Sequence, residues 1–280
     1  MDEVLVRFPQ LGEKTFKKLL NKNLVKCMIV SKTWYNFITN EKFYKLRVQY
    51  ENGQKNLDEF GNTPLHKAAE GGYLSKCKLI IDNVENKNPT NNFGETPLHR
   101  AAKGGYLNIC RIIFKEIKDK NPASNNGLTP LHNAVLCGRL DICKLIIEKT
   151  MDKNPADNSG STPLYFAAGM GHLDICRLII EMILDKNPAN NYGYTPLHGA
   201  AVNGHLDICR LIIEKIVDKN PANNNGLTPL HEAAKMGHLD VCRLIIENVD
   251  NIHPVNNLGY TPKEMAVKYN HILVSQLFEA

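Results

Sequence analysis

The residues of this 280-residue chain that could do chemistry are its eight cysteines and ten histidines. Most of them recur in one register, spaced by 33 residues or a multiple of 33: Cys77, Cys110, Cys143, Cys176, Cys209 and Cys242, with His66, His99, His132, His198 and His231. Thiolates and imidazoles are ligands that zinc prefers, and a cysteine with a histidine is a nucleophile–base pair. Metal binding and thiol catalysis are therefore the chemistries to weigh first.

The spacing of these residues argues against both. The sequence has no Cys-x-x-Cys pair, no zinc-type cluster of Cys and His, no Ser/His/Asp constellation outside the repeat and no glycine-rich phosphate loop. We therefore expect no enzyme activity, no metal and no cofactor. The six periodic cysteines are interpreted as small buried hydrophobic residues, with Cys137 more exposed. Free thiols are typical of a reducing compartment, so we expect a cytoplasmic or nuclear protein.

Composition and charge narrow the class of protein. The chain is 43% hydrophobic and 22% charged, which is typical of a folded globular protein. It has no apolar run of about 20 residues, and its start does not resemble a secretory signal, so we expect no membrane partner. Residues 1–50 hold ten Lys/Arg against four Asp/Glu, a balance of +6 beside +5 for the whole chain. This asymmetry predicts a separate N-terminal module with an acidic partner.

The elements that position the periodic residues come from a repeat. Thr-Pro occurs every 33 residues, at Thr63, Thr96, Thr129, Thr162, Thr195, Thr228 and Thr261. Most copies continue as Leu-His-x-Ala-Ala, reach a glycine nine residues after the Thr, and enter a second apolar stretch such as residues 172–181. This pattern resembles the ankyrin repeat. The resemblance implies an all-α fold, a solenoid of seven helix-turn-helix repeats with hairpin fingers over residues 57–280.

The local chemistry of one repeat agrees with that fold. Thr is suited to the N-cap of a first helix, and Pro is suited to the first position of that helix. Glycine is suited to the left-handed conformation that ends the helix, and Asn270 has that place in the last copy. In the ankyrin family the motif histidine hydrogen-bonds across helix ends and fingers, so its role is structural. His172, His205 and His238 are interpreted as turn residues before the second helices. The seventh copy is degenerate, and we expect a C-terminal cap with a polar outer face.

Residues 1–47 do not follow the repeat, and residues 48–56 are interpreted as a linker. Pro9 and Trp34, the sole tryptophan, stand 25 residues apart among apolar residues at helical spacing. This stretch resembles the F-box, a small helical module. The resemblance implies a core and adaptor-binding face made by Phe8, Pro9, Leu11, Phe16, Leu19, Leu20, Leu24, Val30 and Trp34. The alternative is a helical cap for the first repeat, because an ankyrin array needs one.

Together the two resemblances imply a substrate receptor of a cullin–RING ubiquitin ligase. The F-box would bind a Skp-type adaptor, and the ankyrin groove would bind an unidentified protein substrate. The alternative is an ankyrin scaffold or inhibitor, including an effector that acts in a host cell, whose N-terminal helices only cap the array. Nucleic-acid binding is disfavoured because the N-terminal lysines are scattered, without an Arg-rich run or stacking platform. We expect a monomer.

The substrate surface is predicted from positions at which the repeat varies. Partners of ankyrin proteins usually lie against fingertips and first helices, and aromatic and Met residues favour binding. The predicted surface is centred on repeats 4 and 5, around Phe166, Met170, Tyr192 and Tyr194. Its other members are Phe93, Arg100, Lys103, Leu128, Val202, Leu227, Met236 and Tyr260.

Overall fold

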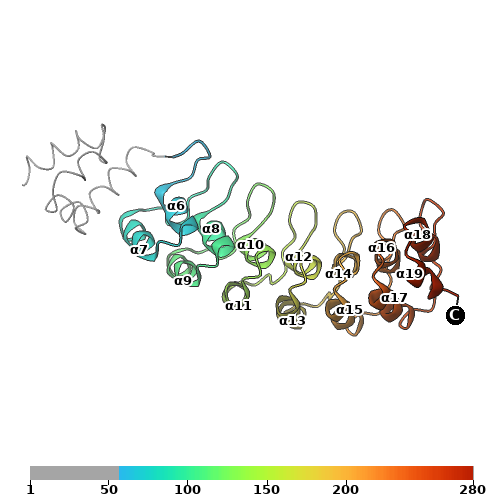
Figure 1. Cartoon of the computed structure of the whole chain (residues 1–280). Coiled ribbons are helices and arrows are strands. Elements are labelled where there is room, and N and C mark those ends of the chain that lie inside the picture. Colours follow the sequence, from blue (N-terminus) through green and yellow to red (C-terminus); the bar gives the residue numbers. More distant parts are fainter. Residues whose placement is uncertain (1–56, 280) are drawn as a thin grey trace, which may run out of the picture. The chain divides into compact units, whose positions relative to one another are not determined.

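The structure is a computed structural model that describes residues 57–279, and all regular elements in that range are helices. They form seven consecutive pairs, stacked side by side in a row (Figure 1). The first helices are α6 (Pro64–Glu70), α8 (Pro97–Gly104), α10 (Pro130–Leu136), α12 (Pro163–Gly169), α14 (Pro196–Val202), α16 (Pro229–Met236) and α18 (Pro262–Lys268). The second helices are α7 (Leu74–Asn83), α9 (Leu107–Glu116), α11 (Leu140–Lys149), α13 (Leu173–Met182), α15 (Leu206–Ile213), α17 (Leu239–Ile246) and α19 (Ile272–Gln276).

The ends of the first helices confirm the predicted capping. In α16 the hydroxyl of Thr228 accepts a hydrogen bond from the backbone N–H of His231, and proline occupies the first turn. Proline fits there because the first N–H groups of a helix have no partner inside it. The glycine nine residues after each Thr of repeats 1–6 has a positive φ, and Asn270 has φ 62° in the last repeat. The sequence motif therefore fixes both ends of each short helix.

The core runs along the row of pairs and is built from the periodic residues. The Leu and the Ala-Ala of the first helices and the Ile and Cys of the second helices are almost all under 5% exposed. Burial raises the pKa of the six periodic cysteines to about 12, so their thiols stay protonated. This confirms that they are packing residues, and Cys137 is half-buried as expected.

Asp-Lys-Asn-Pro loops connect the second helices of repeats 2–5 to the repeats that follow them. In the loop after α9, the ammonium of Lys120 donates to the carbonyls of Phe114 and Ile117, which end that helix. The side chain of Asn121 accepts from the N–H of Leu131 at 3.0 Å, at the start of α10. The loop thus satisfies helix-end groups on both sides, which would otherwise lack partners. The same Asn contact recurs at Asn154, Asn187 and Asn220.

The fingers, which are the loops projecting beyond the first helices in Figure 1, are joined by an asparagine ladder. At each junction one asparagine side chain donates to the backbone carbonyl 33 residues earlier, at 2.9–3.2 Å. The backbone N–H of the same asparagine donates to the next carbonyl of that finger, as from Asn125 to Phe93. The donors are Asn92, Asn125, Asn158, Asn191, Asn224 and Asn257.

The histidines before the second helices do more than form turns. The rings of His205, His238 and His271 each donate from Nε2 to a backbone carbonyl at the end of the first helix of the preceding repeat, at 3.0–3.1 Å. Each ring also lies against the left-handed glycine of that preceding repeat, where even a Cβ atom would clash. The glycines are therefore required by packing as well as by their φ angle.

One expectation is qualified by the fold, and another concerns residues that the structure does not describe. The outer face of the last repeat is less polar than predicted, because Ile272 and Leu273 on α19 are about two-thirds exposed. The F-box-like module at 1–47 and the linker at 48–56 lie outside the described residues. Within 57–279, no helix combines the length and apolar character needed to cross a bilayer.

Candidate protein-binding surface

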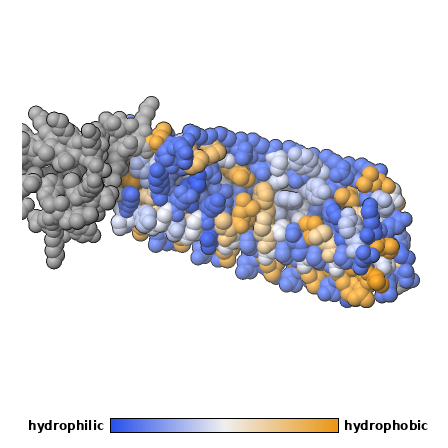
Figure 2. All heavy atoms as spheres, turned by 45° about the horizontal axis from the view of Figure 1, so that its top comes forward, coloured by the Kyte–Doolittle hydropathy of each residue, from blue (hydrophilic) through white to orange (hydrophobic). Residues whose placement is uncertain are grey.

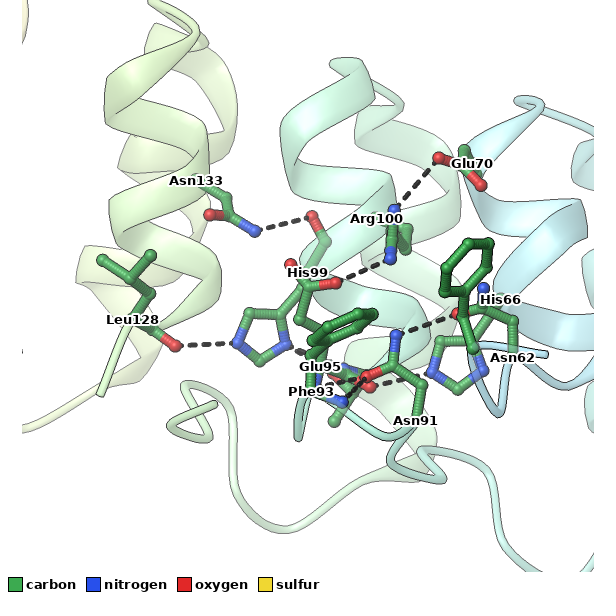
Figure 3. Close-up of polar contacts among 12 residues, drawn as sticks. Asn62, His66, Glu70, Asn91, Phe93, Glu95, His99, Arg100, Leu128 and Asn133 are labelled. Atoms are coloured by element: carbon green, nitrogen blue, oxygen red, sulfur yellow. Dashed lines mark hydrogen bonds and ion pairs between the residues drawn. The ribbon is translucent and has the colours of Figure 1, made fainter. Parts of the chain in front are cut away.

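A histidine bridge joins successive repeats on the finger side of the first helices. In repeat 2, the N–H of Thr96 donates to Nδ1 of His99 at 3.0 Å, and Nε2 of His99 lies 3.0 Å from the carbonyl of Leu128 (Figure 3). Because Nδ1 accepts, the ring proton is on Nε2, which donates to that carbonyl. The bridge recurs at His66, His132, His198 and His231.

Burial keeps these imidazoles neutral. It lowers the pKa of His132 and of His198 to about 4, and it lowers the pKa values of His66, His99 and His231 in the same direction. All five rings are no more than 1% exposed. An imidazole that already accepts on one nitrogen and donates from the other has no free site for a metal ion. This confirms the structural interpretation of the histidines.

The junction between repeats 4 and 5 departs from this pattern. Tyr165 stands where repeats 1–3, 5 and 6 have histidine, and no hydrogen bond of the described residues links its side chain to the carbonyl of Tyr194. The ring of Tyr165 instead packs edge-on against Phe166, at 5.6 Å between centroids. Phe166 also makes an edge contact with His132, at 5.8 Å. An aromatic cluster has therefore replaced a backbone-satisfying bridge.

The next two repeats extend this cluster with a buried carboxylate. Tyr194 packs edge-on against His198, and its hydroxyl donates to Glu232 at 3.4 Å. Glu232 is 4% exposed, on α16. At the equivalent position of α14 the residue is Gly199, which leaves α12 and α14 in close contact. Burial, and then the charge of Glu232, raise the pKa values of Tyr165 and Tyr194, so both hydroxyls stay protonated donors.

The first repeats have different residues and different partners at the same positions. Arg100, which corresponds to Glu232, pairs with Glu95 at 2.7 Å and with Glu70 at 3.1 Å (Figure 3). Two further polar contacts lie around it: the side chain of Asn91 donates to Asn62, and the side chain of Asn133 donates to the carbonyl of His99. Arg100 was predicted to face a partner, but its guanidinium is already occupied by two carboxylates within the array.

The other predicted residues divide into exposed and half-buried groups. Met170, Tyr192, Phe93 and Met236 are 48–62% exposed, and Lys103 is also exposed. Half-buried residues are Leu128, Phe166, Tyr194, Val202, Leu227 and Tyr260. Phe93 lies beside Phe60 at neighbouring fingertips, with 6.2 Å between ring centroids. Viewed from the finger side, an apolar strip crosses the middle of the array, which is where repeat 4 lies (Figure 2).

The structure adds three residues that shape the predicted surface: Tyr165, and the buried Gly199 and Glu232 beneath it. The signal for Tyr165 was its departure from the histidine motif. Glu232 gave no such signal, because its burial depends on Tyr194 and Gly199 in other repeats. The nine residues predicted to form the adaptor face, from Phe8 to Trp34, lie outside the described residues. In residues 57–279 no cluster of His, Cys, Asp and Glu has an arrangement that could hold a metal ion.

Comparison with known proteins supports the ankyrin part of the expectation. A family model described as ankyrin repeats, in three copies, matches residues 20–122, 65–157, 115–188, 151–223 and 215–279. These overlapping matches span most of the chain, and the first begins inside the segment that resembles the F-box. The F-box resemblance gains no support from the family comparison. No curated protein matches the chain.

Proposed function

Because the chain belongs to the ankyrin repeat family, it is a protein–protein interaction module. We propose that its partner binds the finger side of repeats 4 and 5. The surface is the aromatic cluster of Tyr165, Phe166 and Tyr194 with the exposed Met170 and Tyr192. The partner segment is apolar, since aromatic and Met side chains dominate binding hot spots. The module positions its partner and performs no reaction itself.

The observation that carries this proposal is the replaced bridge at Tyr165. Every other junction of repeats 1–7 keeps an imidazole between the threonine and the next finger. Loss of this hydrogen bond at the junction of repeats 4 and 5, where three aromatic rings lie instead, should make the junction less stable than the others. Natural proteins depart from their own structural rules mainly at functional sites.

The experiment changes Phe166, Met170, Tyr192 and Tyr194 together to serine in the full chain. Proteins captured from a cell lysate by the wild type are identified by mass spectrometry, and the variant should lose the main one. Circular dichroism and thermal unfolding check that the helices persist.

A matched control is available elsewhere on the array. Met151, Leu184 and Val217 are 99% exposed, in the loops after α11, α13 and α15. Their joint change to serine removes a comparable number of apolar side chains and should leave capture intact. If the control loses the partner and the quadruple variant retains it, the finger-side placement is wrong.

A finer proposal concerns residues 1–47. It is that they bind a Skp-type adaptor, which would make the chain a substrate receptor of a cullin–RING ubiquitin ligase. The spacing of Pro9 and Trp34 and the +6 balance of residues 1–50 support it. Binding to such an adaptor would raise the concentration of the bound substrate near the ligase.

The competing proposal is a scaffold or inhibitor whose N-terminal residues only cap the array. Joint replacement of Pro9 and Trp34 by alanine distinguishes the two. Under the ligase proposal it should abolish co-purification of the adaptor while the helical signal of the repeats remains. A wild-type chain that binds no Skp-type adaptor would leave the scaffold as the function.

A further inference from the structure

A second surface lies on the second helices of repeats 1–3, away from the fingers. A groove of about 650 Å³ lies across α9, with lining residues from α7 on one side and α11 on the other. Its apolar lining comes from Leu74, Ile112, Phe114 and Leu145. Its cationic lining comes from Lys78, Arg111, Lys115, Lys120 and Lys149, and the lining contains no acidic residue.

The charge of this groove comes from departures from the repeat. Twelve residues after Thr, repeats 3–6 carry Asp141, Asp174, Asp207 and Asp240, whereas repeats 1 and 2 carry Ser75 and Asn108. Nineteen residues after Thr, repeat 2 has Lys115 where repeats 3–6 have glutamate. The second helices of repeats 4–6 thus carry acidic and basic residues in alternation, whereas all the charged residues that line the groove are basic.

Most of these cations have no anionic partner in the described part of the chain. Its five side-chain ion pairs involve none of the groove lysines and not Arg111. Lys120 is held by the carbonyls at the end of α9 and lies 5.8 Å from the ring centroid of Phe114. Lys78, Arg111, Lys115 and Lys149 therefore remain as four cations of like charge around one apolar floor.

We propose that this groove binds an acidic amphipathic helix of a partner protein. Its carboxylates would meet the four cations, and its apolar face would cover Leu74, Ile112 and Leu145. Packed helices lie about 8–10 Å apart, so three of them span about 20 Å, the length of about 14 helical residues. A nucleic-acid backbone would use the charges and leave the apolar floor uncovered. The surface shares no residue with the finger-side site, so the two proposals stand or fall separately.

The test uses a synthetic peptide of about 14 residues with glutamate on one helical face and leucine on the other. Fluorescence anisotropy of the labelled peptide measures its dissociation constant for the full chain. Lys78→Glu, Arg111→Glu and Lys115→Glu together should weaken binding about tenfold or more, and added salt should weaken wild-type binding. Leu145→Asn should also weaken it, because a polar amide would interrupt the floor.

The control reverses three charges on the outer face of the later repeats. Arg177→Glu, Arg210→Glu and Arg243→Glu occupy the same repeat position as Lys78 and Arg111, and should leave peptide binding within about twofold. Equal losses in both triple variants would overturn the proposal, as would absence of wild-type binding. Tighter binding of a single-stranded RNA oligonucleotide or of phosphatidylserine vesicles, abolished by the same three groove changes, would overturn it in favour of those ligands.

Discussion

The junction between repeats 2 and 3 differs from the junction between repeats 4 and 5, although both are built from the same repeat. Around repeats 2 and 3, His99 bridges the fingers and Arg100 is neutralised by Glu70 and Glu95. Around repeats 4 and 5, the bridge is absent at Tyr165, and Glu232 is buried beside Tyr194. None of the ion pairs within residues 57–279 includes Glu232. The first region pairs its variable charge with carboxylates of the array, and the second leaves a buried carboxylate beside an aromatic ring.

The difference shows how a periodic scaffold acquires a local function. The asparagine ladder and the Asp-Lys-Asn-Pro loops continue unchanged through both regions, so the backbone does not depend on the variable positions. Backbone–carbonyl bonds hold the repeats in register, and side chains at the variable positions are free to change. Binding surfaces can therefore arise at one junction without disturbing the next.

The largest expected effect concerns pH, and it tests the bridge in every repeat that has one. In the folded chain the pKa values of His132 and His198 are about 4, below the value of about 6.5 in an unfolded chain. The unfolded state therefore takes up protons first, and stability is fully present above pH 6.5. It should fall as the pH drops from 6.5 towards 4, by on the order of 3 kcal/mol for each of the two histidines.

Urea unfolding of the full chain at intervals between pH 7.5 and pH 4.5 measures this loss. His198→Tyr, which copies the residue of repeat 4, should unfold with a smaller dependence on pH. A variant with an unchanged slope would show that the histidines do not control acid stability and that carboxylates do.

The next effect compares the two kinds of junction directly. At pH 7.5, His198→Tyr should lower the free energy of unfolding by about 2 kcal/mol, because the carbonyl of Leu227 and the N–H of Thr195 lose their partner. Tyr165→His should raise it by about 1 kcal/mol, by completing the missing bridge, and should weaken partner capture. Urea unfolding gives both values. A loss of stability in Tyr165→His would mean that the aromatic packing outweighs a bridge there.

The smallest effect uses two glycines of repeat 4 that sit close together in sequence. Gly171 has φ 79°, and an added Cβ would lie 2.7 Å from the ring of His205, whereas Gly169 is helical and has room. Gly171→Ala should cost about 1–2 kcal/mol, and Gly169→Ala should gain about 0.5–1 kcal/mol. Thermal and urea unfolding measure both. If the two changes have the same sign, the contact between neighbouring repeats at His205 contributes little.

Much of the fold followed from sequence because a solenoid places equivalent positions next to each other. Contacts at separations of 29, 33 and 36 residues recur along the array, each between the same pair of repeat positions. One motif, Thr-Pro-Leu-His with its glycine, is therefore enough to predict the caps, the buried cysteines and a structural role for His66 or His231. The asparagine ladder was not predicted, because finger asparagines also suit simple turns.

The binding surfaces depend on contacts that the period does not specify. Tyr194 contacts Glu232 across 38 residues and Arg100 contacts Glu70 across 30, and among the described residues each contact occurs at a single place in the array. The sequence by itself determined the helices, their order and the variable positions. Whether a variable charge is neutralised within the array, as at Arg100, or left beside aromatic rings, as at Glu232, was decided by tertiary structure. The physical reason is that side-chain pairing depends on which neighbours the stacked repeats bring within reach, and a single glycine such as Gly199 changes that set.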